Sequence, residues 1–432
     1  MARLRIVYVG GGSTRAPGTV ASFIRQWENF AGSEIVLVDV HEEHLDLVRR
    51  LAAKMADVAG ADLTVTATSR REEALVGADV VLSSYRPGGF EARVLDERIP
   101  LRHGVIGQET QGPGGFFMAL RAIHVARQLV EDMSRLCPNA VLFNYTNPVN
   151  VVAQAVRDFS DVRVISLCEG PIIFPRQLAG MAGLDPNRVR ASMIGLNHAC
   201  WSDASTGGAM YGDEDLWPHV EAALASGRVT DAWATRLLDL ALVMRSVPAA
   251  YMRYYYFRRE VLAELRTAPT TRAEDILAAT SDYWTHYREL LDAPHPVLDP
   301  KRSRGGIYEL EIAVDVMDAM YNDRAEVWPC NVVNGGALRD LPADLVVEGP
   351  CVVDRDGPRL LSGFRLPEGA RGLVGALGEY QRLAAHAAWN GSRTDAIRAL
   401  SANPIVPGLS VARALYDDLA AAQRAWLPER LW

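Results

Sequence analysis

Long apolar runs and basic clusters are absent from this sequence of 432 residues. No stretch of about eighteen apolar residues occurs, so we expect no membrane-spanning helix. The 45 Lys and Arg residues are outnumbered by 53 Asp and Glu residues, and no segment is rich in Lys or Arg. With a net charge of -8 and no basic patch, neither nucleic acid nor an anionic membrane is expected as a partner.

Cysteine is also scarce, and its distribution bears on the cellular compartment. The five cysteines form an odd, scattered set: Cys137, Cys168, Cys200, Cys330 and Cys351. Such a set in a long chain is typical of reduced thiols in a cytosol and not of a disulfide framework. The first residues run directly into a predicted strand without an apolar leader segment. We therefore expect a cytoplasmic protein.

Short strands alternate with helices in the first part of the chain. Strands are predicted at residues 6–9, 35–38, 63–67, 80–83, 141–145 and 164–167. Helices are predicted from the residues after Ser13 to about Phe30, at 41–58 and at 116–136, with a long Gly-rich loop at 84–115. This alternation predicts an α/β fold whose N-terminal part is a Rossmann-like, doubly wound parallel sheet.

The second part of the chain is richer in helices. Helices are predicted at 230–247, 271–291 and 304–321, and strand-like pieces at 193–196, 345–347 and 351–353. A chain of this length suits two fused domains. We therefore expect a Rossmann domain at residues 1–167 and an α+β domain at residues 168–432.

A glycine-rich turn lies between the first strand and the first helix. Gly10, Gly11 and Gly12 would let a phosphate approach the backbone, and Ser13 follows them. The free N–H groups and the positive dipole end of a helix suit a pyrophosphate. Asp39 ends the second strand, where a carboxylate would accept hydrogen bonds from a ribose diol and repel a 2′-phosphate. We predict binding of NAD in preference to NADP; the alternative is a surface turn, because the third glycine of the usual fingerprint is missing.

Three polar segments follow predicted strands, at the sheet edge where open α/β sheets bind ligands. They are Asn144–Pro148, Cys168–Pro171 and Gly195–His198. The Cys168 thiolate and the His198 imidazole could share a divalent metal ion. A buried thiol and a structural histidine are the alternative interpretations of these two residues.

Eight ordered segments give the chain a resemblance to a known family. They are GGGS, LDERIPLRHGVIGQETQGPGG, NYTNP, LCEGP, GLNH, YMRYY, TRAE and NGGALRDLPADLVVEGP. The set resembles the NAD- and manganese-dependent glycosidases of glycoside hydrolase family 4 over nearly the whole chain. The resemblance implies that cleavage begins with oxidation of the sugar C3 hydroxyl by NAD+. A tyrosinate then removes the C2 proton, the C1 leaving group departs, water adds and the hydride returns, so that NAD is regenerated.

The resemblance also implies catalytic and metal-binding roles for particular residues. Cys168 and His198 would hold Mn2+, and Tyr251 would be the base that removes the C2 proton. An aromatic residue in the domain core is the alternative for Tyr251. The other candidates for the base are its sequence neighbours Tyr254, Tyr255 and Tyr256. The second domain would carry catalysis and oligomerisation, and a homodimer or homotetramer is expected.

Substrate contacts follow from the same motifs. Arg93, Asn147 and Asn197 would contact the sugar, and Arg272 of the TRAE segment would bind the anionic group on C6. The substrate would thus be a small anionic glycoside of the 6-phosphoglucoside type. A surface ion pair is the alternative for both Arg93 and Arg272.

The residue after Cys168 departs from the family pattern. Members that cleave 6-phospho-β-glucosides usually carry Asn there, and those that cleave 6-phospho-α-glucosides carry Asp as a general acid. This chain has Glu169, which favours an α-linked substrate with Glu169 as the acid. The rest of the chain resembles the 6-phospho-β-glucosidases more, so both linkages stay open.

The turn after the glycines departs as well. The family commonly reads GGGSTYTP, whereas this chain has Arg15 in place of the aromatic residue and Ala16 in place of a hydroxyl. Ser13 and guanidinium groups such as that of Arg15 could hold a sulfonate on C6. The related NAD-dependent sulfoquinovosidases, which cleave α-linked sulfoquinovosides, are therefore an alternative.

Two alternatives belong to other functional classes. An ordinary NAD-dependent dehydrogenase would release NADH, and related folds do this. A non-catalytic NAD sensor would not need its catalytic residues. The presence of Cys168, His198 and Tyr251 together favours the glycosidase over both.

Overall fold

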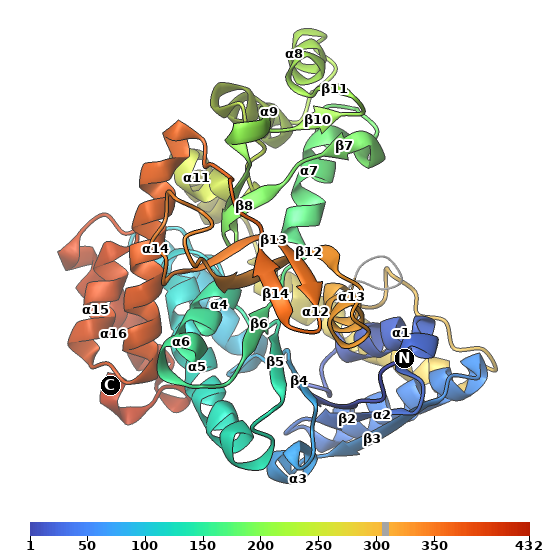
Figure 1. The fold of residues 1–432 in the computed structure, drawn as a ribbon. Coiled ribbons are helices and arrows are strands. Elements are labelled where there is room, and N and C mark those ends of the chain that lie inside the picture. The colour runs from blue at the N-terminus through green and yellow to red at the C-terminus, as the bar shows by residue number, and fades with distance from the viewer. Residues whose placement is uncertain (305–310) are drawn as a thin grey trace.

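Six parallel strands form the N-terminal part of the central sheet, in the order β3–β2–β1–β4–β5–β6 (Figure 1). The computed structural model describes residues 1–304 and 311–432. These strands are β1 (Arg5–Val9), β2 (Ser33–Val38), β3 (Leu63–Thr68), β4 (Val80–Ser83), β5 (Val141–Asn144) and β6 (Val164–Ser166). Neighbouring strands pair in parallel throughout. This is the order of a doubly wound Rossmann sheet, as the sequence predicted.

Helices cover both faces of this sheet. The helices of this part of the chain are α1 (Ala16–Arg25), α2 (Glu42–Ala59), α3 (Arg71–Leu75), α4 (Gly89–Arg102), α5 (Gly112–Leu136) and α6 (Val149–Phe159), and α7 (Gly170–Met181) follows them and packs against β8 and α9. Ile6 and Tyr8 of β1 are buried in one core with α1 and α2. Val7 and Val9 are buried in the other core with α3, α5 and α6. Because successive strand side chains point to opposite faces, one apolar segment stabilises both layers.

Antiparallel strands from the second half of the chain extend the same sheet beyond β6. They are β12 (Glu326–Val333), β13 (Val346–Asp354), β14 (Gly357–Leu360), β8 (Met193–Leu196) and β9 (Ala199–Ser202). β12 joins β6 where Asn331 lies opposite Ser166, and β13 joins β8 where Glu348 lies opposite Gly195. Both halves therefore share one sheet, which links β6 and β8 through β12 and β13.

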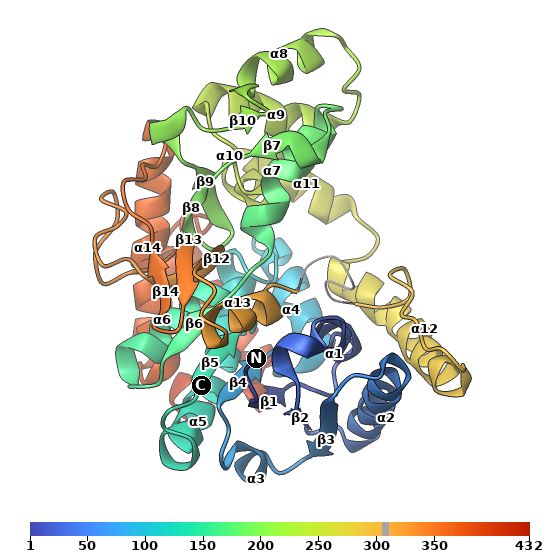
Figure 2. The same ribbon diagram turned by 45° about the vertical axis from the view of Figure 1, so that its right-hand side comes forward.

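The remaining elements are mostly helices. They are α8 (Trp217–Ala225), α9 (Ala232–Met244), α10 (Arg253–Tyr256), α11 (Arg258–Thr267), α12 (Arg272–Asp292), α13 (Ile312–Tyr321), α14 (Glu368–Trp389), α15 (Arg393–Ala402) and α16 (Leu409–Ala422). A small sheet consists of β7 (Val189–Arg190), β10 (Met210–Tyr211) and β11 (Glu214–Asp215). In Figure 2, α12 lies beside α2, and α14 lies on the other side of the molecule.

The prediction of one long loop at residues 84–115 is wrong, because α4 occupies Gly89–Arg102. A helix here gives no amphipathic signal, since its buried face carries charge. Arg93, Asp96 and Glu97 are all buried, at the spacing of one helix face. Asp96 pairs with Arg121 of α5 at 2.6 Å, and both side chains are inaccessible to solvent. Buried ion pairs thus interrupt the apolar stripe that a sequence pattern detects.

Smaller differences concern the second half. The two strand-like pieces at 345–347 and 351–353 form one strand, β13, and α14 to α16 were not predicted. The helix predicted at 304–321 is seen as α13 from Ile312, while residues 305–310 lie outside the described part of the chain. The domain boundary after residue 167 stays a prediction. Among the residues that the structure describes, no helix has the length and apolar character needed to cross a membrane.

Candidate active site

The glycine turn joins β1 to α1, and its backbone geometry requires glycine. Gly10 has φ of +96°, and a Cβ there would lie 2.3 Å from the Ser84 carbonyl oxygen. The Gly12 N–H donates to Asp39 Oδ2 at 2.9 Å, so the turn and the predicted ribose ligand are in contact. Ser13 Oγ is buried and has no hydrogen-bond partner among the described residues. This turn fits a dinucleotide, with a hydroxyl available to a phosphate.

Cys168 and His198 come together although 30 residues separate them. Cys168 follows β6, and His198 lies in the turn between β8 and β9 with φ of +62°. Cys168 Sγ is 3.7 Å from His198 Nε2. His198 Nδ1 contacts Thr110 Oγ1 at 3.0 Å, which fixes the ring with Nε2 towards the thiol. One divalent ion with bonds of about 2.0–2.4 Å could be shared by both atoms.

Burial controls the charge of this pair. Burial lowers the pKa of His198 to about 4, so the imidazole is neutral at neutral pH, as a metal ligand must be. Burial, with Glu348 and Glu169 adding to it, raises the pKa of the Cys168 thiol. A thiol in this position needs a neighbouring cation to ionise. The described residues contain no group of three or more His, Cys, Asp or Glu side chains arranged for a metal ion, so this pair would supply only part of a ligand set.

The Tyr251 ring covers the imidazole of His198. The two ring centroids are 3.8 Å apart and the planes differ by 7°. Burial raises the pKa of Tyr251, Cys168 and Glu109 raise it further, and Arg93 opposes them. Tyr251 lies in a short 3-10 helix, Ala250–Met252.

The neighbouring tyrosines have other partners. Tyr255 donates its hydroxyl hydrogen to Gln111 Oε1, and Tyr256 donates to the Gly369 carbonyl oxygen at 3.5 Å. The ring of Tyr254 lies under the Arg253 guanidinium at 5.2 Å. Of the four candidate bases, Tyr251 is thus the one stacked on His198.

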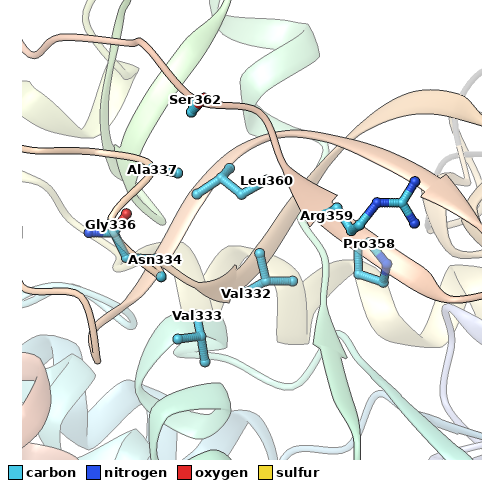
Figure 3. Close-up of a pocket in the computed structure, with 10 residues that line it drawn as sticks. Val332, Val333, Asn334, Gly336, Ala337, Pro358, Arg359, Leu360 and Ser362 are labelled. Atoms are coloured by element: carbon cyan, nitrogen blue, oxygen red, sulfur yellow. The ribbon is translucent and has the colours of Figure 1, made fainter.

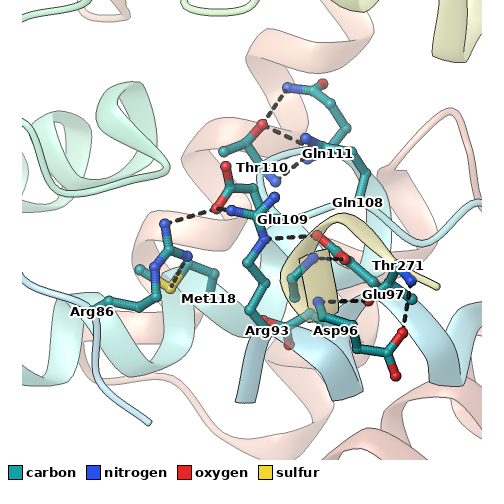
Figure 4. A network of polar contacts seen from close by, with 12 residues as sticks. Arg86, Arg93, Asp96, Glu97, Gln108, Glu109, Thr110, Gln111, Met118 and Thr271 are labelled. Atoms are coloured by element: carbon teal, nitrogen blue, oxygen red, sulfur yellow. Dashed lines mark hydrogen bonds and ion pairs between the residues drawn. The ribbon is translucent and has the colours of Figure 1, made fainter. Parts of the chain in front are cut away.

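Arg93 is held between two carboxylates in the network of Figure 4. Its Nε donates to Glu97 Oε1 at 2.7 Å, and its Nη1 lies 2.8 Å from Glu109 Oε2. Glu109 also pairs with Arg86 at 2.7 Å. Burial alone would raise the pKa of Glu109, but Arg86 and Arg93 outweigh burial and lower it. Because Glu109 precedes Thr110, the network continues directly to His198.

The two asparagines that were predicted to contact the sugar differ in their hydrogen bonds. Asn197 Nδ2 donates to Glu348 Oε1 at 2.9 Å, and Asn331 Nδ2 donates to the same oxygen at 2.9 Å. The amide nitrogen of Asn197 is therefore already engaged by the protein. Asn147 Oδ1 is buried and has no partner in the described part of the chain, which leaves it available to a sugar hydroxyl.

Arg15 contacts protein carboxylates. Its Nη2 lies 2.7 Å from Glu169 Oε1 and 3.5 Å from Glu311 Oε1. Its guanidinium also stands 4.7 Å from the centre of the Tyr145 ring. The pair of Arg15 and Glu169 therefore joins the dinucleotide turn to the residue beside Cys168.

The Arg272 side chain forms no ion pair with the other predicted site residues. Arg272 begins α12, is exposed, and forms no ion pair with the residues that the structure describes. The adjacent Ala273 N–H donates to Glu97 Oε2 at 2.9 Å, which connects this helix end to the Arg93 network. The role of Arg272 towards the C6 anion stays a prediction.

Sequence reasoning missed several polar residues of this region. They are Arg86, Glu109, Thr110, Glu311 and Glu348. Glu109 and Thr110 belong to the GQET segment that carried the family resemblance, so a signal was present for them. Glu348 likewise lies in the NGGALRDLPADLVVEGP segment, whereas Arg86 and Glu311 carry no local signal, because each acts through partners from distant segments.

A surface hollow of about 520 Å³ lies elsewhere, along the end of β12 and beside β14 (Figure 3). Its lining includes Val332, Val333, Gly336, Arg359 and Leu360. None of the predicted site residues lines it, so we do not assign it to the active site.

The family follows from comparison of the sequence with known proteins. The family described as "Family 4 glycosyl hydrolase" matches residues 5–184, and the C-terminal domain of the same family matches residues 193–406. The chain belongs to family 4 of the glycosyl hydrolases. The predicted family and its fold are therefore confirmed.

Relatives in family 4 match this chain over its whole length. A probable 6-phospho-β-glucosidase of Bacillus subtilis is 35% identical over 99% of this chain and 98% of the relative. A 6-phospho-α-glucosidase of Leptotrichia buccalis is 29% identical over 99% of each chain. The 6-phospho-β-glucosidase of Thermotoga maritima, solved with manganese, NAD+ and glucose-6-phosphate, has a TM-score of 0.84 at 28% identity, covering 98% of this chain and 99% of that chain. These relatives give no support to the sulfoquinovosidase alternative.

Proposed function

We propose that this family 4 enzyme hydrolyses 6-phospho-β-glucosides, with NAD and Mn2+ as cofactors. The observation that carries the proposal is the Cys168–His198 pair, with Sγ and Nε2 3.7 Å apart and the Tyr251 ring stacked on the imidazole. A donor set of one thiol and one neutral imidazole suits a divalent transition-metal ion. Arg15 and Glu169 connect this pair to the dinucleotide turn, so cofactor and metal would serve one site.

When bound, NAD can accept and return a hydride at sugar C3, and the metal ion can stabilise negative charge on sugar oxygen. Tyr251 would take the proton from C2, because its phenol lies against the metal-holding histidine. Asn147 would orient a sugar hydroxyl through its free buried oxygen. Arg93 would contact the sugar from a position held by Glu97 and Glu109.

The comparison of relatives favours the β linkage. The relative at 35% identity is a probable 6-phospho-β-glucosidase, whereas the α-specific relative is 29% identical. Glu169 Oε1 accepts a hydrogen bond from Arg15 at 2.7 Å, so the protein already engages this carboxylate. The role of Glu169 as a general acid for an α-linked substrate stays a prediction.

A substrate panel tests the proposal. Nitrophenyl α- and β-glucosides, each with and without a 6-phosphate, would be assayed with NAD+ and Mn2+. We expect release of the phenol from the 6-phospho-β-glucoside above all, with no net formation of NADH. Stoichiometric NADH without phenol release would instead indicate a dehydrogenase, and preference for the α anomer would restore the acid role of Glu169.

Asp39 is expected to set the cofactor preference. Asp39→Asn keeps an oxygen that can accept the Gly12 N–H but removes the negative charge that would face a 2′-phosphate. We expect the ratio of the NADP and NAD dissociation constants to fall by roughly tenfold, since like charges brought together are costly. Calorimetric titration of both cofactors measures this ratio. Asp46→Asn on the exposed face of α2 is the control, and equal affinity of the unaltered protein for both cofactors would contradict the assignment.

We also propose that the protein is cytosolic. A cytosolic location would keep Cys168 reduced, as a thiolate ligand requires. The expected assembly is a homodimer or homotetramer, which sedimentation would determine.

A further inference from the structure

A row of buried polar side chains crosses the central sheet. Residues that lie directly opposite one another on neighbouring strands point to the same face of the sheet. From β4 to β13, five such positions in succession carry polar side chains, and all five are buried. In the order of the strands, this polar row consists of Ser83, Asn144, Ser166, Asn331 and Glu348. Buried positions in a central sheet are normally apolar, so the row needs a separate explanation.

One end of the polar row lies beside the two predicted metal ligands. Ser166 is the last residue of β6 and stands two positions before Cys168. Glu348 of β13 lies opposite Gly195 of β8, three positions before His198. In the sheet, β12 and β13 lie between β6 and β8 (Figure 1). The separation of Cys168 and His198 is therefore set across these two strands, at the level of Glu348.

Glu348 joins the polar row to the turn that carries His198. Its Oε1 accepts hydrogen bonds from Asn331 Nδ2 and Asn197 Nδ2, each at 2.9 Å. Asn197 immediately precedes His198, whose φ of +62° is uncommon for a residue with a side chain. A backbone of this kind persists where the surrounding structure holds it in place. The bond from Asn197 to Glu348 thus anchors the turn.

Asn197 contacts the other predicted ligand as well. An amide nitrogen carries two hydrogens, so the Asn197 side chain can donate to two acceptors. It donates to Glu348, and it also forms a hydrogen bond with the Cys168 thiol. The amide of Asn197 therefore lies between a buried carboxyl group and the sulfur that would bind the metal ion.

Packing of the sheet does not account for a carboxyl group at position 348. The Glu348 side chain is inaccessible to solvent, and both side chains that donate to its Oε1 are neutral amides. No Lys or Arg of the described residues offsets its charge. Replacement of such a buried group by an apolar one of similar size is often neutral or stabilising for a fold. The carboxyl group is thus costly for stability, and its benefit lies in the residues that it holds.

We propose that Glu348 is a positioning residue for the metal site. Through Asn197 it holds the Cys168 thiol and the His198 turn at the separation of 3.7 Å that one shared metal ion can bridge. The inference rests on the proposed function, because it needs Cys168 and His198 to hold Mn2+. It also gives Asn197 a role in orienting the ligands, in place of the predicted sugar contact. Partners that orient metal ligands from outside typically change metal affinity by about 10–100-fold.

Metal titration of the NAD-loaded protein, followed by electron paramagnetic resonance, tests this role without reference to turnover. Glu348→Met removes the acceptor but keeps the length of the side chain, and we expect the Mn2+ dissociation constant to rise by about 10–100-fold. Glu348→Gln keeps an oxygen that can accept both hydrogen bonds, so its Mn2+ affinity should stay close to that of the unaltered protein. NAD affinity should be unchanged in both variants, because neither alters the glycine turn.

A second set of variants shows whether Glu348 acts through Asn197. Asn197→Leu should weaken Mn2+ binding to a similar extent, and the protein that carries both Asn197→Leu and Glu348→Met should lose no more affinity than either single variant. Losses that multiply in the double variant would reveal independent effects and overturn the proposal. Asn197→Leu also gives an answer if Glu348→Met does not fold, because unaltered Mn2+ affinity in Asn197→Leu would overturn the proposal by itself.

Gln381→Met is the matched control. Gln381 is also buried, and its Nε2 donates to the carbonyl oxygen of Val346, in the same strand as Glu348, at 2.9 Å. Its other partners are Asn150 and Gln154, away from the predicted ligands. This replacement should lower the melting temperature, because buried polar partners are left unpaired, but should leave Mn2+ affinity unchanged.

Three results for Glu348 would overturn the proposal. The first is unaltered Mn2+ affinity in Glu348→Met, and the second is an equal loss in Glu348→Gln, which would show that charge matters and not the hydrogen bonds. The third is a fall in NAD affinity together with Mn2+ affinity, which would show a general structural role. An unaltered protein that binds no Mn2+ would overturn both this inference and the metal assignment. If it binds Mn2+ but cleaves no 6-phosphoglucoside, the proposed function fails, while a Glu348-dependent Mn2+ affinity would still support the positioning role.

Discussion

Replacing Tyr251 by Phe is expected to lower kcat/KM for a 6-phospho-β-glucoside by roughly 10²–10⁴-fold, the range that a positioned general base contributes. The phenol oxygen is the group proposed to remove the C2 proton, and Phe keeps the ring that stacks on His198. Binding of NAD and Mn2+ should therefore survive. Burial raises the pKa of Tyr251, so the phenol keeps its proton near neutral pH until a cation lies beside it.

Isotopes show whether the lost step is proton removal at C2. In D2O, the unaltered enzyme should place deuterium at C2 of the product, and Tyr251→Phe should lose this exchange together with cleavage. Tyr256→Phe is the matched control, because its hydroxyl bonds to the Gly369 carbonyl oxygen and not to the metal pair. Retained exchange in Tyr251→Phe would assign the base to another residue. Product without deuterium from the unaltered enzyme would count against elimination.

The second large effect is expected when Cys168, one of the two predicted metal ligands, is replaced. Cys168→Ser removes the thiolate that lies 3.7 Å from His198 Nε2, and a serine hydroxyl is a poor ligand for a transition-metal ion. We expect Mn2+ affinity to fall by more than about 100-fold, because loss of an outer partner alone costs about 10–100-fold. Turnover should fall with it at limiting Mn2+, while NAD affinity stays nearly unchanged.

Metal titration followed by electron paramagnetic resonance measures this affinity directly, without reference to turnover. Cys137→Ala is the control, because Cys137 is a buried thiol at the end of α5 with no partner in the metal pair. A chelator should abolish activity of the unaltered enzyme, and added Mn2+ should restore it. Full activity of Cys168→Ser in the presence of chelator would refute the metal assignment.

The local sequence was sufficient to predict those strands whose bounds depend on residues close by in the chain. The strand before Gly10–Gly12 and the strand before Asp39 were predicted, because apolar runs and glycine turns act within a few residues. The strand before His198 was predicted with the bounds that the structure has, Met193–Leu196. In contrast, α4 was missed, because half of its buried residues, Arg93, Asp96 and Glu97, are charged and resemble a surface.

By itself, the sequence determined the N-terminal fold class, the family and the residue types available to the site, because these depend on short motifs and on their order. Only the tertiary structure decided the partners of those residues. It placed Tyr251 on His198, bound Arg15 to Glu169, and left Arg272 exposed. The physical reason is that charge pairing and ring stacking depend on distance in space. Each of these pairs joins residues more than 50 positions apart, where no spacing in the chain records the contact.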